Sequence, residues 1–182
     1  MNTKVTENDG MVAAEYARLR ERYTPKHPKL IFVLESPPIS GKYFYNPEGR
    51  TTEPLFSAMM KDVLELSPRT KAEGLTEFAA HGYLLIDATY VPVNLPGSPG
   101  ARNKAADARI LMDLPLLVAE LHQRVLADTK LLLVKSNVCR LLERPLTQQG
   151  FTVLNANRSI PFPSNGQQPR FRNSVRAALG LV

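Results

Sequence analysis

The hydrophobic pattern alternates between short continuous apolar runs and longer segments with apolar residues at helical spacing. The runs at 30–34, 83–86 and 131–134 have the length and composition of strands buried on both faces, and 151–154 is a weaker fourth. A charged residue directly follows each of the first three runs. The pattern therefore predicts four short, buried strands.

Segments of helical periodicity lie before, between and after these runs. We expect helices at 11–22, 54–66, 107–126, 136–142 and 169–179. Pro115 is expected to kink or restart the third of them. Ser136 or Asn137 is expected to cap the fourth.

Buried strands separated by helices indicate an α/β protein. We expect a three-layer α/β/α sandwich around a central, mainly parallel, four-stranded sheet. No internal repeat or low-complexity linker divides the chain. We therefore expect a single domain over 1–182, in which 1–28 forms an N-terminal helical extension.

Composition narrows the class further. The 182 residues are 43% hydrophobic and 22% charged, which is typical of a globular protein. No apolar stretch reaches the roughly 18 residues of a membrane span, and the polar segment 1–10 lacks the apolar part of a signal peptide. Cys139 is the only cysteine, which excludes an internal disulfide and a cysteine-ligated cluster. We expect a soluble, cytoplasmic protein in which Cys139 is a buried structural thiol.

The net charge of +6 is concentrated in two segments without acidic residues. The segment 144–182 carries five arginines, and the segment 88–106 carries Arg102 and Lys104. Basic loops rich in Pro, Gly and Asn suit a nucleic-acid backbone, because each phosphate contact releases counterions. A solvated basic surface explains the charge equally well. Asn94 and Asn103 are interpreted as turn residues of the second segment.

Polar and aromatic residues follow the predicted strands. Glu35 and Ser36 follow the first strand, with three aromatics at 43–45 after them, and Asp87 ends the second strand. The carboxyl ends of parallel strands meet at one edge of a sheet, where ligands bind. Aromatic rings, a carboxylate and arginines together describe a nucleobase pocket. Each residue also has an ordinary structural role open to it, as a cap, an ion-pair partner or a core aromatic.

Four short motifs succeed one another along the chain: LESPP at 34–38, YFYNP at 43–47, LLIDATYVPVN at 84–94 and FPS at 162–164. In order and spacing they resemble the uracil-DNA glycosylase superfamily from Leu30 onward. LESPP resembles the Gly-Glu-Ala-Pro-Gly type of first motif. YFYNP is similar to the Pro-Phe-x-x-Pro segment of the mismatch-specific uracil/thymine branch, and FPS to the His-Pro-Ser motif that grips DNA.

Several positions depart from the family pattern. Ser36 stands where the best-known branch has a water-activating Asp, and Glu35 stands beside it as in the iron–sulfur branch, whose four cysteines this chain lacks. Phe162 replaces a His that donates to the base carbonyl. Asp87 replaces an Asn that reads the base edge. An ionised carboxylate only accepts hydrogen bonds, so Asp87 either reads a ring N–H or an exocyclic amine, or donates because burial raises its pKa.

The resemblance implies a role for each candidate residue. Glu35, with Ser36 beside it, is the candidate catalytic residue that stabilises the cation-like sugar or positions water. Base contacts are assigned to Phe44, Tyr45, Asp87 and Phe162. Phosphate contacts are assigned to Ser164, Asn165, Arg102, Arg158, Arg170 and Arg172. No metal or cofactor is expected.

The expected function is that of a DNA glycosylase, which hydrolyses the N-glycosidic bond of a damaged or deaminated base. The expected partner is single- or double-stranded DNA, with no membrane involved, and the expected state is a monomer. Two alternatives remain open. One is a nucleic-acid-binding protein that kept the fold but not the hydrolysis, and the other is a hydrolase of free nucleosides.

Overall fold

The computed structural model describes residues 7–93 and 98–181. Three parallel strands, β1 (Leu30–Leu34), β2 (Tyr83–Asp87) and β3 (Lys130–Leu133), form an open sheet in the order β2-β1-β3. All five residues of β1 are buried, because this strand is central and helical connections cover it. The predicted α/β class, the first three strands and their parallel direction are confirmed.

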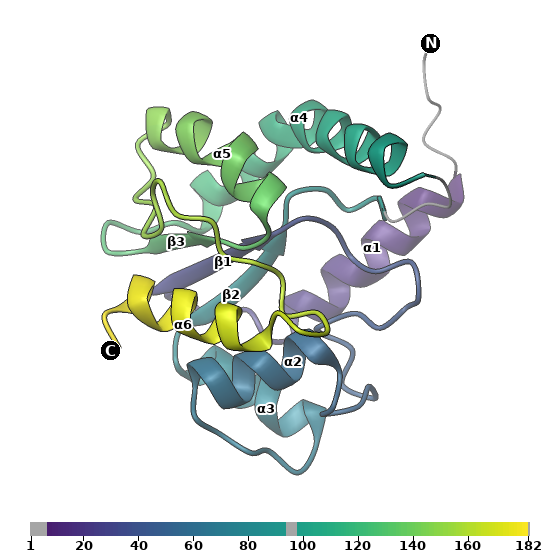
Figure 1. Ribbon diagram of the computed structural model, residues 1–182. Helices are drawn as coiled ribbons and strands as arrows, with labels where there is room; N and C mark the ends of the chain where they lie inside the picture. Colours follow the sequence, from purple (N-terminus) through teal and green to yellow (C-terminus); the bar gives the residue numbers. More distant parts are fainter. Residues whose placement is uncertain (1–6, 94–97, 182) are drawn as a thin grey trace.

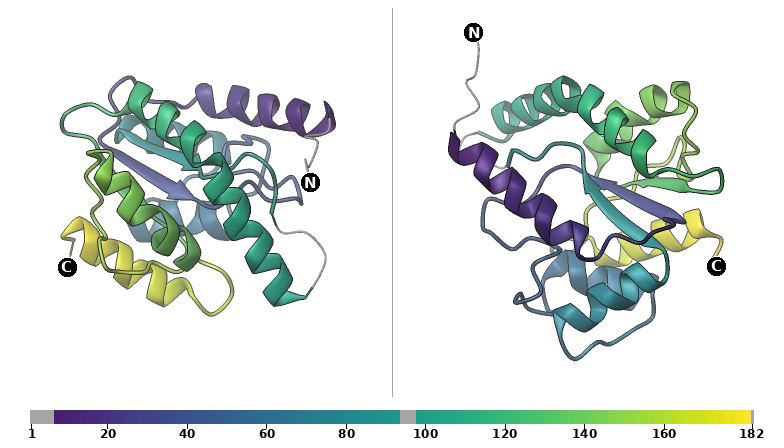
Figure 2. Two further views of the ribbon diagram at one scale, coloured as in Figure 1. Left: turned by 90° about the horizontal axis from the view of Figure 1, so that it is seen from above. Right: turned by 180° about the vertical axis from the view of Figure 1, so that it is seen from behind.

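Helices lie on both sides of the strands (Figure 1). Two helices lie on one side: α4 (Pro99–Arg124) and α5 (Ser136–Gln148). On the other side are α2 (Pro54–Ala58), its π-helical continuation Met59–Val63, α3 (Lys71–Ala80) and α6 (Gln168–Leu179). The view from above in Figure 2 (left) looks onto the α4 and α5 side of the molecule. In this view α1 (Glu7–Glu21) lies along one border of the molecule and α6 lies along the opposite border. Within 7–93 and 98–181, no helix is both long and apolar enough to cross a membrane.

Aromatic rings join α1 to the loop that follows β1. Tyr16 lies 4.2 Å from Tyr43 between ring centroids, and Tyr23 stacks on Tyr45 at 6.4 Å. The buried Arg20 of α1 also forms an ion pair with Glu120 of α4. The helix of the N-terminal segment is therefore packed onto the same loop that carries the candidate base-stacking aromatics.

The fourth expected strand is reduced to one bridge. Val153 pairs in parallel with Leu131, and no longer ladder forms there among the described residues. The side chain of Asn155 explains the difference: its Oδ1 accepts from the N–H of Leu133 at 2.9 Å, and its Nδ2 donates to the C=O of Leu133 at 3.0 Å. A side-chain amide thus takes the place of a strand backbone at this edge. The buried Cys139 lies beside it, with Sγ 3.3 Å from the same carbonyl, which confirms the structural thiol.

Three helical expectations need correction. The helix expected at 107–126 begins at Pro99, because Ser98 Oγ accepts from the N–H of Ala101 and proline suits a first helical turn. Much of the second basic segment is therefore helix, including Asn103, while Asn94 lies outside the described residues. α4 also continues through Pro115 as one helix, so the expected restart does not occur; Ile110 and Leu117 on either side of the proline are buried in the core. Helix α3 was not anticipated, and α5 extends beyond 142 to Gln148.

Candidate functional site

A cavity of about 520 Å³ lies at the carboxyl ends of the strands. It is bounded by the ends of β1 and β2, by the loop that follows β1, by the first turn of α2, by Lys135 after β3 and by the segment before α6. Six residues proposed from the sequence line this one cavity: Glu35, Ser36, Phe44, Asp87, Phe162 and Ser164. The structure therefore brings together residues that are up to 129 positions apart in the chain.

The aromatic wall of the cavity is rigidly packed. Phe44 is 4% exposed, and its ring meets Phe56 at 5.9 Å and the edge of Tyr45 at 5.0 Å. The buried Lys71 holds the loop, because its Nζ donates to the Tyr43 carbonyl and to Glu53, both at 2.7 Å. Phe44 is thus held in place in the wall of the cavity.

Tyr45 does not line the cavity. Its side chain is fully buried, and its hydroxyl accepts a hydrogen bond from the N–H of Leu85 at 2.7 Å. Tyr45 therefore supports β2 and the ring of Phe44 from behind. Tyr43 lines the cavity instead, and its buried hydroxyl has no hydrogen-bond partner among the described residues.

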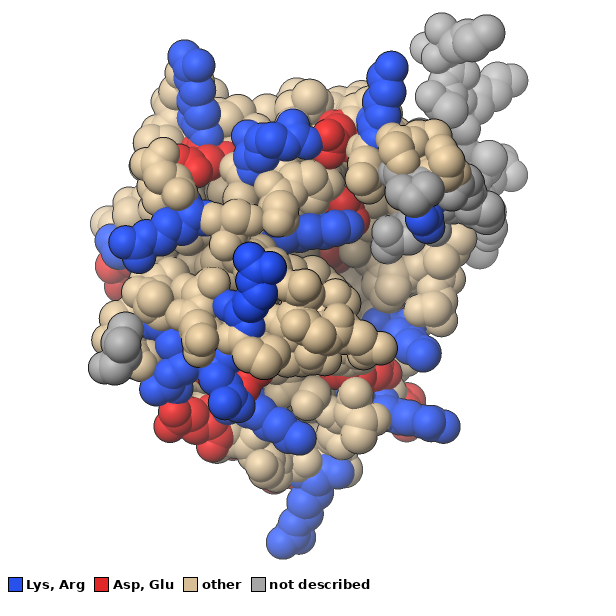
Figure 3. Space-filling view, in the orientation of Figure 1, with Lys and Arg blue, Asp and Glu red and all other residues tan. Residues whose placement is uncertain are grey.

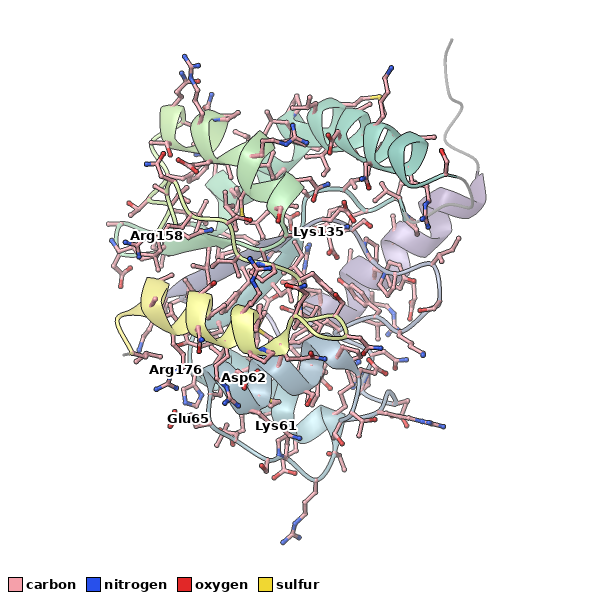
Figure 4. The ribbon with its side chains drawn as sticks, viewed as in Figure 1. Lys61, Asp62, Glu65, Lys135, Arg158 and Arg176 are labelled. Atoms are coloured by element: carbon pink, nitrogen blue, oxygen red, sulfur yellow. The ribbon has the colours of Figure 1, made fainter. Side chains whose placement is uncertain are left out.

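Glu35 is held on both carboxylate oxygens. It is 6% exposed; Oε1 accepts from Nδ2 of Asn137 at 2.6 Å, and Oε2 forms an ion pair with Nζ of Lys135. Asn137 Nδ2 also lies 3.3 Å from Asp107. Asn137 was expected as a helix cap, but Lys135 occupies the N-cap position of α5 and no side chain caps it. The first turn of α5 therefore orients Glu35. In Figure 4, Lys135 lies where α5 begins.

The backbone of Lys135 is strained. Its φ of 87° and ψ of 136° lie in a region that suits glycine, whereas other residues adopt it at a cost of about 1–3 kcal/mol. Its N–H donates to the carbonyl of Ile160 at 2.8 Å, and its C=O accepts from Cys139 at 3.0 Å. The segment between α5 and α6, through Ile160, and the first turn of α5 thus hold Lys135 in this conformation, in which it lines the cavity.

This strain predicts a stability difference. In a Glu35→Gln background, where the ion pair is absent, the further change Lys135→Gly is expected to raise the free energy of unfolding by about 1 kcal/mol. Lys135→Ala in the same background is the matched control, because alanine keeps the Cβ that causes the strain. Urea unfolding measures both. A Gly variant no more stable than the Ala variant would contradict strain at this position.

Asp87 is buried, and one of its two carboxylate oxygens lacks a hydrogen bond among the described residues. It is 4% exposed, and its Oδ2 has no hydrogen-bond partner among the described residues. Burial raises the pKa of its carboxyl from 3.8 to about 7; Arg20 opposes this shift, and the negative charges of Glu120 and Glu35 add to it. The side chain lines the cavity. Near neutral pH, Asp87 can therefore present a protonated carboxyl, which both donates and accepts.

The other predicted residues that line the cavity, Ser36, Phe162 and Ser164, lie in loops. Ser36 Oγ accepts from the N–H of Val93 at 3.4 Å, which joins the loops after β1 and β2. Phe162 is half-buried, and its carbonyl accepts from the N–H of Ser164 at 2.8 Å. This turn places both side chains at the cavity.

The predicted phosphate contacts are dispersed. Asn165 and Arg172 line a second hollow of about 460 Å³, which shares Pro54 with the main cavity. Arg172 is paired there with Asp62 at 2.7 Å. Arg158 lines a third hollow of about 310 Å³.

Arg102 and Arg170 are exposed on the first turns of α4 and α6. Figure 3 shows Lys and Arg side chains spread over the face that carries α5 and α6, with acidic side chains beside several of them. Of the predicted phosphate contacts, Ser164 lines the cavity itself, and Asn165 and Arg172 line the hollow that shares Pro54 with it, whereas Arg102, Arg158 and Arg170 line neither.

Sequence reasoning missed Lys135 and Asn137 as site residues. Lys135 directly follows the third buried run, so it had the same signal as Glu35 and Asp87: a charged residue at the carboxyl end of a core strand. No sequence pattern distinguishes the hydrogen bond of Asn137 to Glu35 from the expected helix cap.

Within 7–93 and 98–181, no three His, Cys, Asp or Glu side chains are grouped to hold a metal ion. Comparisons of the chain with protein-family models, curated proteins and solved structures gave no match. Inferences about function therefore rest on the motifs and on the geometry of the cavity.

Proposed function

We propose that this protein is a DNA glycosylase-like enzyme that hydrolyses the N-glycosidic bond of a damaged or deaminated base. The observation that carries the proposal is the convergence of Glu35, Phe44, Asp87 and Phe162 in one cavity. These residues come from four separate motifs whose order resembles the uracil-DNA glycosylase superfamily. The sheet and its helices are consistent with the α/β/α sandwich of that family, with the bridge at Val153 as the counterpart of its fourth strand.

In the proposed complex, the extruded base enters the cavity and lies against Phe44, with Phe162 at its other side. The cavity of about 520 Å³ falls within the usual range of small-molecule sites. Asp87 hydrogen-bonds to the polar edge of the base. Glu35 then faces the sugar, where a carboxylate stabilises the positive charge that develops as the glycosidic bond breaks.

The adjoining hollow supports a nucleic-acid substrate. Asn165 directly follows Ser164 in the chain, and Asn165, Arg172 and Lys61 line the hollow that shares Pro54 with the cavity. In the proposed complex these groups bind phosphates on either side of the extruded nucleotide. A free nucleoside would not use them, so we favour DNA over the nucleoside alternative.

The test is base release from labelled single- and double-stranded oligonucleotides. Each carries uracil, hypoxanthine, xanthine or a mismatched thymine, and abasic sites are revealed by alkali. We expect release from at least one substrate, and its loss in the Glu35→Gln variant. Binding without release from any of them would contradict the enzyme.

A non-catalytic DNA-binding protein is the second candidate, and one observation favours it. Both carboxylate oxygens of Glu35 are engaged, by Lys135 and by Asn137, so neither is free to orient water in this state. Under this alternative the oligonucleotides bind with the same affinity whether or not they carry an altered base.

A further inference from the structure

We propose that Lys135 is the nucleophile of an abasic-site lyase activity, in which its Nζ forms an imine with C1′ of an abasic deoxyribose in the same cavity. The substrate class rests on the proposed function, because an abasic sugar is what base excision leaves there. The imine chemistry itself requires only an aldehyde in reach of Lys135. No role for this lysine was implied by the motifs.

Three features of Lys135 support this role. Its side chain lines the cavity and its Nζ contacts the buried carboxylate of Glu35. Its side chain is 36% exposed, so the amine is accessible to a substrate. Its backbone is held at φ 87°, and a non-glycine residue kept in such a conformation is typical of functional sites.

The neighbouring carboxylate provides the proton acceptor that a nucleophilic amine needs. Glu35 takes one proton from the ammonium of Lys135, and the neutral amine attacks the C1′ carbonyl of the ring-opened sugar. The C1′–N bond forms as the π bond of the carbonyl breaks, and a proton passes from the nitrogen to the oxygen, which becomes a hydroxyl. Glu35 then returns the proton to this hydroxyl, water leaves, and a protonated imine remains. Asn137 keeps Glu35 oriented throughout.

The imine makes the next bond break without any oxidant or metal. The Glu35 carboxylate accepts a proton from C2′, and the electrons of that C–H bond form an enamine. The enamine expels the 3′ phosphate, whose oxygen keeps the electrons of the C3′–O bond, and the proton passes from Glu35 to the departing phosphate. Water hydrolyses the remaining iminium, which restores the ammonium of Lys135 and releases an unsaturated aldehyde.

The experiment uses a duplex with one preformed abasic site, made beforehand by an independent glycosylase. The full-length protein is incubated with it in the presence of borohydride, which reduces an imine to a stable amine, and the cross-linked peptide is identified by mass spectrometry. A parallel reaction without borohydride or alkali measures strand cleavage. Because base excision is bypassed, failure here is distinguishable from failure of the proposed glycosylase.

The variants are Lys135→Arg, which keeps the charge beside Glu35 but forms no imine, and Lys130→Arg, a matched change at the opposite end of β3. We expect a cross-link on Lys135, with both cross-link and cleavage reduced to the level without protein in Lys135→Arg and unchanged in Lys130→Arg. Unfolding midpoints of both variants confirm that they fold. A cross-link on Lys42 or the N-terminal amine, no cross-link, or a cross-link without cleavage would each overturn the proposal.

Discussion

Glu35→Gln is expected to reduce base release by about 100- to 10,000-fold, a loss typical of removing one charged catalytic group. Glutamine has nearly the same shape, but Lys135 and Asn137 both donate to Glu35, and a glutamine amide has one acceptor oxygen, so it keeps one of the two hydrogen bonds. The variant therefore removes the negative charge and one hydrogen bond while keeping the volume of the side chain. A cation-like sugar loses its nearest compensating charge, so the transition state is destabilised more than the bound substrate.

DNA affinity is expected to change little in this variant, because phosphate contacts supply most of the binding free energy. Single-turnover kinetics and fluorescence anisotropy measure release and binding separately. The matched control is Glu65→Gln. Glu65 is exposed, its carboxylate pairs with Arg176 of α6, and neither residue lines the cavity. Figure 4 shows both well apart from Lys135. Equal losses of rate and affinity, or an unchanged rate, would contradict a catalytic role for Glu35.

The position of the cavity followed from the sequence because charged residues stand where the predicted strands end. β1 and β2 come from continuous apolar segments. Glu35 directly follows β1, and Asp87 is the last residue of β2. Once the strands are parallel, their carboxyl ends share one edge of the sheet. The register confirms this, since Leu34 pairs with Asp87. Local pattern and topology were sufficient for this part of the site.

Which side chain points to the cavity did not follow from local pattern. Phe44 and Tyr45 are adjacent, yet one lines the cavity and the other is bonded to Leu85. Their loop has no regular period, so its orientation is set by distant contacts, such as that of Lys71 with the Tyr43 carbonyl. Contacts of this kind depend on the tertiary structure.

Helix α3 could have been predicted from the residues at its N-terminus, although its apolar residues do not show a clear helical period. Thr70 Oγ1 accepts from the N–H of Glu73 at 3.1 Å, and the Glu73 carboxylate accepts from the N–H of Arg69 at 2.7 Å. This arrangement resembles a capping box, whose Thr-x-x-Glu pattern is readable in the sequence. Gly74 weakens the intrinsic helix propensity there, but its missing Cβ lets Phe56 pack closely.

Asp87→Asn is expected to stabilise the protein increasingly as the pH rises. In the unfolded chain the Asp87 carboxyl has a pKa of about 3.8, and burial raises the folded-state pKa to about 7. Between these values the folded state keeps a proton that the unfolded state releases. Stability of the wild type therefore falls as pH rises through this window. The whole difference between the two pKa values corresponds to a loss of roughly 4 kcal/mol in the free energy of unfolding once the pH is above 7.

Asparagine does not titrate, so the variant lacks this loss. The charged groups around position 87 remain: Arg20 from α1, Glu120 from α4 and Glu35 directly after β1. Because these groups are present in both proteins, the difference between variant and wild type isolates Asp87. Urea unfolding at pH 4.5, 6 and 8 measures it, with the exposed Asp128→Asn as matched control.

The same measurement bears on base recognition. A difference that grows from pH 4.5 to pH 8 would show that the buried carboxyl holds its proton near neutrality, and thus that it can donate to an acceptor on the base edge. Parallel stability curves for Asp87→Asn and wild type would show an ionised Asp87 throughout. In that case the cavity would accept only a base that presents an N–H or amine to this carboxylate, and its release rate would not follow the titration of Asp87.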